Sequence, residues 1–433
     1  MGNERQKSRP VIVIVGGGFA GINLAKKLRN APVDIVLLDR HNYHTFQPLL
    51  YQVATGTLGA DTIAFPLRRL FQGQKNFVFH VAEVQRVNPE KNTIDTTIGE
   101  IAYDYLVLAT GATTNFFGSP QLEHFAMDMK TVPQALNLRS MILQNMEKAL
   151  TEKDPEIKDD WMRFVIVGGG PTGVELAGAL AEFRNHILEK DYPGLDKNLM
   201  SVYLIESKPR VLGVMSEEAS AKAKAYLEKM GVILYNGVRV SSYDGISLQI
   251  NNGTEMKTRN VLWAAGVLGD VPQGLPEDRL QKNRRIDTDE INRVKGFQNI
   301  FAIGDVAAAI SADYPQGHPG VAQVAIQQGQ HLATNLMALM AGRPATPFVY
   351  KDKGSLATIG RNKAVADLGK LKFGGFFAWL IWSVVHLFSL AGFKNRLFVF
   401  MTWIGKYVSN NVSTRLIIRP FSRELMTEDP AAK

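Results

Sequence analysis

Two glycine-rich loops contain the residues whose types and spacing indicate the clearest chemistry. The first loop consists of Gly16, Gly17, Gly18, Phe19, Ala20 and Gly21, and the second contains Gly168, Gly170, Pro171, Thr172 and Gly173. Each loop follows a β-branched run typical of a buried strand and leads into a helical pattern. Such a loop turns tightly and brings backbone N–H groups close to a pyrophosphate. The sequence therefore predicts two dinucleotide sites, whose loops begin 152 residues apart.

An acidic residue follows each loop at the end of the next predicted strand. Asp39 comes 18 residues after the first loop, and we expect it to accept a hydrogen bond from an adenosine ribose. Glu206 comes 33 residues after the second loop, an interval that indicates an extended helix and loop through 182–199. An acid here favours NAD(H) and repels the 2′-phosphate of NADP(H). Because Lys208 and Arg210 follow closely, the nucleotide preference stays open.

Three later segments repeat the strand-and-turn pattern in a nested order. Residues 103–111 and 261–266 each end a predicted strand at a glycine, and residues 299–305 end one at Gly304 and Asp305. This order predicts an α/β fold with two Rossmann-like domains, one for FAD and one for NAD(H). Asp305 is a candidate ligand of the FAD ribityl hydroxyls, although taken alone it is more simply a turn aspartate.

Other polar residues near these motifs are candidates for chemistry. Gln323 and Gln327 share one face of a predicted helix, where neutral amides could hydrogen-bond the carbonyl groups of a quinone. A helix cap with surface glutamines is the alternative. Glu175 lies in the first turn after the second loop, where a helix-dipole partner is the competing interpretation. The chain has no cysteine, which excludes disulfides, thiolate metal sites and cysteine nucleophiles, and we expect no metal.

The C-terminal part of the chain is basic and aromatic. From Lys370 onward it has nine Lys or Arg against three acids, so it contributes an excess of six to the total charge of +8. Residues 373–393 carry no formal charge, and a second apolar segment spans 397–404. Basic residues at both ends favour an interfacial helix on an anionic bilayer. A spanning helix and a buried dimer interface are the alternatives. Nucleic-acid binding is not expected, because the cations are interleaved with apolar runs.

The chain resembles the two-dinucleotide-binding flavoproteins, in which an NAD domain is inserted into an FAD domain. The AQxAxQxG pattern from Ala322 and the Phe46–Gln52 segment narrow the resemblance to type II NADH:quinone oxidoreductases. That resemblance implies that hydride passes from NADH to non-covalent FAD, and electrons then pass to a membrane quinone without proton pumping. The expected domains are 1–120 and 291–345 for FAD, 121–290 for NAD(H) and 346–433 for membrane association.

The resemblance also implies roles for particular residues. Gln323 and Gln327 match the family's quinone-site glutamines, and Glu175 matches a glutamate near nicotinamide and flavin. A lysine found in some members has no clear counterpart here, and His386 or Lys394 is expected nearby. Protons for the quinone would come from Glu175, His386 or water. The further positions expected to bind cofactor are Arg40, Pro48, Val84, Ala109, Thr110, Gly111, Ala322, Ala265 and Gly266.

The expected location is the cytoplasmic face of the cell inner membrane, with lipid contact through residues of about 370–420 and a possible homodimer. Two other functions stay open on the sequence. One is a soluble-type reductase that passes electrons to a ferredoxin-like protein, and the other is a membrane-docked sensor of NADH.

Overall fold

The computed structural model describes residues 9–311, 313–409 and 414–423, and the chain divides into two compact units. Unit 1 comprises Met1–His44, Phe65–Thr113 and Val267–Asp352, and unit 2 comprises Thr45–Ala64, Thr114–Gly266 and Lys353–Lys433. Each unit is assembled from segments that the other interrupts. The nested α/β organisation predicted from the motifs is therefore confirmed.

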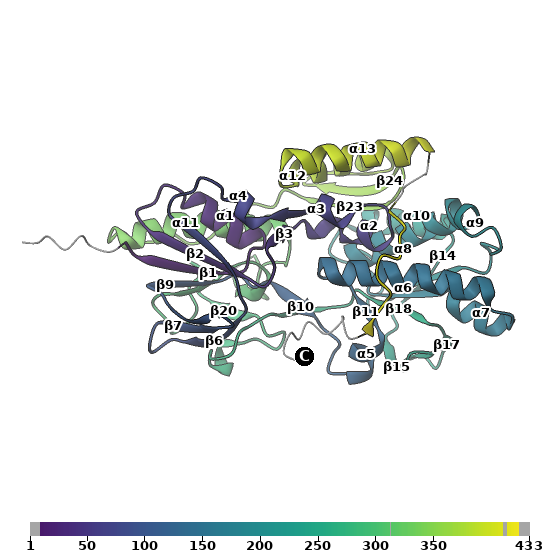
Figure 1. The fold of residues 1–433 in the computed structure, drawn as a ribbon, viewed down its shortest axis with the longest axis horizontal. Coiled ribbons are helices and arrows are strands. Elements are labelled where there is room, and N and C mark those ends of the chain that lie inside the picture. The colour runs from purple at the N-terminus through teal and green to yellow at the C-terminus, as the bar shows by residue number, and fades with distance from the viewer. Residues whose placement is uncertain (1–8, 312, 410–413, 424–433) are drawn as a thin grey trace, which may run out of the picture. The chain divides into compact units, whose positions relative to one another are not determined.

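Unit 1 is built on a five-stranded parallel sheet with the order β21-β9-β1-β2-β5. Its strands are β1 (Val11–Val15), β2 (Asp34–Asp39), β5 (Phe77–Val81), β9 (Tyr105–Leu108) and β21 (Ile300–Ala302). The strands β9, β1 and β2 of this sheet are labelled in Figure 1. The central strand β1 is buried from Ile12 onward, as expected for a parallel strand with both faces covered. Helix α1 (Phe19–Lys27) packs against α11 (Ala322–Met340), and Gly329 lies so close to the backbone of Ala20 that a side chain would not fit.

Shorter elements complete unit 1. They are α4 (Leu67–Leu70), β6 (Val84–Asn88), β7 (Thr93–Thr96), β8 (Gly99–Ala102), β19 (Val267–Gly269), η2 (Glu277–Arg279), β20 (Ile286–Thr288), η3 (Gly304–Val306) and β22 (Ala307–Ala309). The chain crosses between the units near β3 (Tyr43–Thr45), β4 (Ala64–Pro66) and β10 (Ala112–Thr114).

Unit 2 repeats the architecture with a parallel sheet in the order β11-β18-β12-β13-β14. Its strands are β11 (Met127–Asp128), β12 (Arg163–Val167), β13 (Ser201–Glu206), β14 (Val232–Asn236) and β18 (Asn260–Trp263). The glycine loop joins β12 to α8 (Pro171–His186), which is longer than its counterpart α1. Together with α9 (Leu188–Asp191), this longer helix accounts for the wide spacing between the second loop and Glu206.

The other elements of this part of unit 2 are mainly helical. They are η1 (Gln47–Leu49), α2 (Leu50–Ala54), α3 (Ala60–Ile63), α5 (Pro120–Phe125), α6 (Val132–Thr151), α7 (Pro155–Met162), α10 (Glu217–Lys229), β15 (Val240–Tyr243), β16 (Ser247–Ile250) and β17 (Glu255–Lys257).

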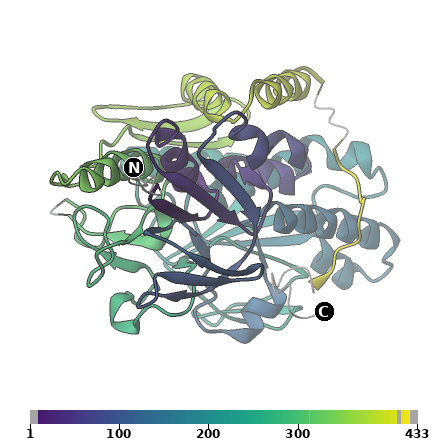
Figure 2. The same ribbon diagram turned by 60° about the vertical axis from the view of Figure 1, so that its left-hand side comes forward.

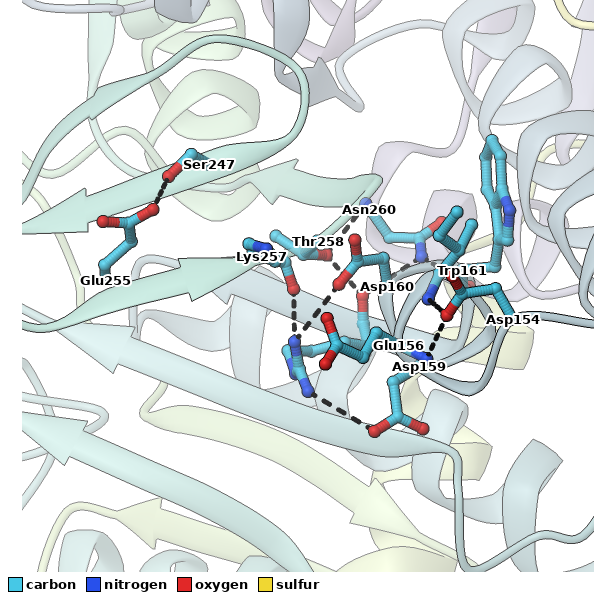
Figure 3. Close-up of polar contacts among 12 residues, drawn as sticks. Asp154, Glu156, Asp159, Asp160, Trp161, Ser247, Glu255, Lys257, Thr258 and Asn260 are labelled. Carbon is cyan, nitrogen blue, oxygen red and sulfur yellow. Dashed lines mark hydrogen bonds and ion pairs between the residues drawn. The ribbon is translucent and has the colours of Figure 1, made fainter.

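A network of polar side chains connects the end of α7 to the starts of β12 and β18 in unit 2 (Figure 3). The Asn260 amide donates to the carbonyl oxygens of Trp161 at 2.8 Å and Arg163 at 3.1 Å, and the Thr258 hydroxyl donates to the same Arg163 carbonyl. The Arg163 guanidinium lies 3.6 Å from Asp160. Burial raises the pKa of Asp160, although Arg163 opposes the shift. These contacts hold β12 and β18 together at their starts, so that the glycine loop leaves β12 in a defined direction.

The C-terminal part of unit 2 is an antiparallel sheet with two helices outside it. The sheet contains β23 (Ser355–Gly360), β24 (Lys363–Leu368) and β25 (Leu371–Gly374), and the helices are α12 (Phe376–Ser389) and α13 (Phe393–Ser409). Both yellow-green helices lie together beside this sheet (Figure 2). On the other side β23 packs on α8, where Gly178 leaves room for the carbonyl group of Ile359. The uncharged run 373–393 is divided, because its first residues join β25 and Gly392 has φ +82° between the helices.

The compact units do not follow the predicted domain boundaries throughout. Residues 45–64 belong with unit 2, because α2 packs against α6 and α8. Residues 267–290 belong with unit 1, where β20 pairs with β22. The described C-terminal residues, 353–409 and 414–423, are grouped with unit 2, where β23 packs on α8 and β24 on α10.

Candidate functional site

The first glycine loop of unit 1 leaves space where a dinucleotide needs it. Gly16 has φ +111°, and a Cβ there would overlap the carbonyl oxygen of Ala109. A Cβ at Gly21 would overlap the carbonyl oxygen of Gly16. At Gly18, by contrast, a Cβ would meet no described atom within 4 Å, and α1 has no side-chain cap at this end. The uncapped N–H groups and open space fit the pyrophosphate of FAD.

Asp39 supports this loop as well as marking the end of β2. Its Oδ2 accepts the Gly17 N–H at 2.6 Å, and its Oδ1 accepts the His41 N–H at 2.7 Å. Burial raises the pKa of Asp39, while both N–H groups lower it. The buried ring of His44 also binds the loop, through the carbonyl oxygen of Gly17 at 3.0 Å. His44 was not identified from the sequence.

Arg40 and Asp305 are two further residues of unit 1 that were expected to bind FAD. Arg40 pairs with Asp270 and with Glu83, so its guanidinium already has two carboxylate partners. Asp305 lies in the turn η3, beside Gly320. The buried Gln328 holds that turn, because its Oε1 accepts the Gly304 N–H at 2.7 Å. In the sequence nothing distinguished Gln328 from its neighbouring glutamines.

The expected cofactor positions fall in both units. Unit 1 contains the first loop with Asp39, Arg40, Val84, Ala109, Thr110, Gly111, Asp305 and Ala322, and unit 2 contains the second loop with Glu206, Ala265, Gly266 and Pro48. Pro48 lies in η1, which is grouped with unit 2, whereas the other residues expected to bind FAD are grouped with unit 1.

The second loop reproduces the first in detail. Gly168 has φ +110°, and a Cβ at Gly170 would meet no described atom within 4 Å where α8 begins without a side-chain cap. Glu206 accepts the Gly169 N–H at 2.6 Å and the Lys208 N–H at 2.8 Å. Arg210 turns away from this acid, because its guanidinium donates to the carbonyl oxygens of residues 213, 215 and 216.

Glu175 is buried on α8 where the helix meets the C-terminal part of unit 2. Burial raises the pKa of its carboxyl group to about 8. The backbone N–H of Thr358 and the indole N–H of Trp382 face the carboxyl group and lower the pKa. The indole nitrogen is buried without a well-formed hydrogen bond to any described residue. The carboxyl group is therefore protonated at neutral pH, a state that a simple helix-dipole partner would not adopt.

A second buried glutamate, Glu182, lies seven residues further along α8. Its Oε2 is 2.9 Å from Lys406 Nζ of α13, and its Oε1 accepts the Arg361 N–H. Burial raises the pKa of Glu182, but Lys406 and the Arg361 N–H outweigh this, and the net pKa lies below its usual value. The two glutamates of α8 therefore differ in protonation state because Glu182 has a cation beside it.

A chain of hydrogen bonds runs from α13 to α2. Trp403 Nε1 donates to Gln52 Oε1 at 2.8 Å, and Gln52 Nε2 donates to the Tyr51 hydroxyl at 2.8 Å. Burial raises the pKa of the Tyr51 hydroxyl, and the carboxylates of Glu175, which is ionised at the alkaline pH where a tyrosine titrates, and Glu182 raise it further. Tyr51 thus lies among the buried acids of unit 2, although in the sequence it stood out only as part of a family motif.

His386 and Lys394, the two residues expected near the C-terminal part of the quinone site, have different surroundings. His386 stacks on Trp382 with ring centroids 4.2 Å apart, and its Nδ1 bonds to the Trp382 carbonyl oxygen at 2.8 Å. Burial lowers the pKa of His386 to about 4. Lys394 is exposed and lies over the ring of Phe398 at 5.5 Å. His386 therefore belongs to the surroundings of Trp382 and Glu175.

Gln323 and Gln327 lie half-buried near the start of α11 in unit 1. The Gln327 amide makes a two-way pair with the Lys351 backbone, donating to its carbonyl oxygen and accepting its N–H, both at 3.0 Å. Gln327 therefore holds the segment that follows α11. Gln323 lies one turn closer to the start of the same helix, and this helix packs against the turn η3, which contains Asp305.

Two family models match the chain. The model described as pyridine nucleotide-disulphide oxidoreductase covers residues 10–329, and the NDH2 C-terminal domain covers residues 353–410.

Named relatives and a solved structure agree with these models. A type II NADH:quinone oxidoreductase of Mycobacterium tuberculosis is 38% identical over 92% of this chain and 88% of its own length. A mitochondrial internal alternative NAD(P)H-ubiquinone oxidoreductase of Arabidopsis thaliana is 31% identical over 95% of this chain and 87% of its own. The structure of NDH2 from Plasmodium falciparum in complex with NADH has a TM-score of 0.85 at 23% identity, covering 95% of this chain and all of that one, which is evidence of a shared fold.

Proposed function

The chain belongs to the type II NADH:quinone oxidoreductases of the pyridine nucleotide-disulphide oxidoreductase family, and on this premise we propose how its residues perform the reaction. The enzyme oxidises NADH, reduces a quinone and pumps no protons. Bound FAD supplies the two-electron relay between the two substrates. We assign FAD to unit 1 because of the open space at Gly18 and the uncapped start of α1.

NADH binds at the second glycine loop, with Glu206 directed at the adenosine ribose. Two observations favour NADH over NADPH. Glu206 is held at the loop by the Gly169 N–H, and Arg210 is occupied by backbone carbonyl groups. The carboxylate of Glu206 would therefore repel the 2′-phosphate of NADPH, and Arg210 is not placed to offset this repulsion.

Replacement Glu206→Gln is expected to narrow the preference for NADH over NADPH by about tenfold, because it removes a repulsion of roughly 1–2 kcal/mol. The measurement is kcat/KM for each nucleotide with the same quinone. Glu189→Gln, an exposed acid of the same unit paired with Lys197, is the control and should leave the ratio unchanged. An unchanged ratio in Glu206→Gln would contradict the assignment.

Glu175 is the proton donor that the buried site supports best. Quinone reduction consumes two protons, and Glu175 carries one at neutral pH because its pKa is about 8. His386, with its pKa near 4, is neutral, and its Nδ1 proton is held by the Trp382 carbonyl oxygen. We therefore assign proton delivery to Glu175 and an uncharged wall of the site to His386.

The amide of Gln323 is assigned to a quinone carbonyl. Gln327 stays a predicted residue of the quinone site, and because its amide pairs with the Lys351 backbone, we propose that it holds the segment after α11 in place. Neutral amides suit this task because they donate a hydrogen bond without bringing a charge into an apolar pocket.

Replacement Gln323→Leu is expected to lower quinone turnover about tenfold or more while flavin reduction by NADH stays intact, because one hydrogen bond to the quinone is lost. Gln330→Leu, on the exposed side of the same helix, is the control. The two half-reactions are measured separately by stopped flow under anaerobic conditions. A parallel fall of both rates would refute the quinone assignment.

The outer faces of α12 and α13 are assigned to lipid. Phe377, Phe388, Phe393 and Val408 are 71%, 67%, 80% and 79% exposed, which is unusual for large apolar side chains in one part of a surface. In residues 9–311, 313–409 and 414–423 no helix is long and apolar enough to cross a membrane. Because these exposed faces are apolar and aromatic, we propose that both helices lie in the headgroup layer of a bilayer. The cytoplasmic face stays a prediction of the resemblance. Part of the predicted lipid-contacting range, residues 410–413, lies outside the described residues.

Anaerobic addition of NADH followed by a short-chain quinone tests the whole proposal. Bleaching of the flavin absorbance and its rapid recovery are expected. Bleaching without recovery would instead favour a protein acceptor or a sensor, functions that the named relatives do not support. A homodimer stays a prediction of the resemblance.

A further inference from the structure

The helix α13 has a burial pattern opposite to that of a typical surface helix. Its polar residues Asn395, Arg396 and Lys406 are partly buried, whereas most of its large apolar residues are exposed. Within Phe393–Ser409, Val399 is the one fully buried apolar side chain. Apolar packing of α13 therefore comes from Val399 and from the rings of Trp403 and Tyr407 against α12, and not from a continuous apolar face as on most surface helices.

Polar contacts within unit 2 hold α13 instead. At its start the Asn395 amide donates to the carbonyl oxygen of Ala64 at 3.1 Å. Further along, Trp403 donates to Gln52 at 2.8 Å. Near its end the Lys406 ammonium lies 2.9 Å from Glu182.

The last of these contacts is an ion pair largely removed from water. The side chains of Lys406 and Glu182 are only 24% and 11% exposed. Glu182 also accepts the Arg361 N–H, and the Arg361 guanidinium lies 4.0 Å above the ring of Tyr407 on α13. One carboxylate thus joins α8, the turn between β23 and β24, and α13.

We infer that Lys406 and Glu182 are positioning residues that hold α13 with its apolar face toward an anionic bilayer and its Trp403 against Gln52, next to Tyr51. The inference rests on the proposed membrane docking and quinone chemistry. The same helix α8 carries Glu182 and Glu175, so the contact of Glu182 with Lys406 links α13 to the helix that carries Glu175. Neither residue touches the reacting groups itself.

The test compares Lys406→Met, Glu182→Gln and the double variant in the FAD-loaded full chain. Three quantities are measured: binding to vesicles of phosphatidylcholine and phosphatidylglycerol, KM for a short-chain quinone in detergent, and the rate of flavin reduction by NADH. Each single variant is expected to weaken vesicle binding and raise the quinone KM about tenfold, with flavin reduction unchanged, because one partner of a buried pair is left uncompensated. Lys197→Met is the control, since it breaks an exposed pair of similar length, 3.1 Å.

The double variant separates positioning from stability. Removing both charges should restore the thermal unfolding midpoint toward wild type, because no uncompensated buried charge remains. The quinone KM should stay high, because the contact is still missing. Recovery of both properties, or wild-type behaviour of Lys406→Met, would overturn the inference. Failure of the wild-type enzyme to bind vesicles would instead count against the proposed membrane docking.

Discussion

The variant Glu175→Gln is expected to unfold at nearly the same temperature as wild type at about pH 4 and at a clearly higher temperature at about pH 9. In the folded chain the pKa of Glu175 is about 8, against an ordinary value of 4.5. The folded state therefore binds the proton more tightly, and wild type loses stability as pH rises between these two values. Each unit of separation is worth roughly 1.4 kcal/mol, so the full loss is several kcal/mol. Glutamine resembles the neutral acid but cannot ionise, so the variant does not lose this stability as pH rises.

The same variant is expected to slow the quinone half-reaction at neutral pH by about 10²-fold, because an amide cannot deliver a proton in place of the acid. In wild type this rate should fall as pH rises through about 8, the pKa of Glu175. Glu218→Gln, an exposed acid paired with Lys222, is the control for both experiments. If the variant kept the alkaline inflection of wild type, another group would have to be the donor.

The variant Gly178→Ala is expected to destabilise the chain by roughly 2–4 kcal/mol despite the better helix propensity of alanine. Its Cβ would overlap the carbonyl oxygen of Ile359 in β23, which is backbone and cannot rotate away. The helix α8 and strand β23 would have to separate, moving Thr358 away from Glu175. We expect a lower thermal midpoint and a larger loss in the quinone half-reaction than in flavin reduction.

Gly405→Ala is the matched control, because Gly405 also lies within a helix, α13, and an added Cβ there would meet no described atom within 4 Å. It should be neutral or stabilise the chain by about 0.5–1 kcal/mol. Equal losses in the two variants would show that the contact of Gly178 with Ile359 is not the cause.

The local motifs were readable in the sequence because their parts are neighbours in the chain. A phosphate-binding loop needs a strand, glycines and a helix in succession, and both loops occur with open space at Gly18 and Gly170. The acids Asp39 and Glu206 lie at the ends of β2 and β13, where that pattern places them. Even the wide spacing before Glu206 had a local cause, the length of α8.

The sequence alone thus determined two dinucleotide loops, their nested order and an apolar C-terminal segment flanked by cations. Tertiary structure decided which residues meet across long separations, such as Lys406 with Glu182, 224 residues apart, and Trp403 with Gln52, 351 apart. It also decided protonation, since Glu175 and Glu182 are the same residue type on the same helix. Only their burial and neighbours leave one neutral and the other ionised, because the free energy of a charge depends on what surrounds it.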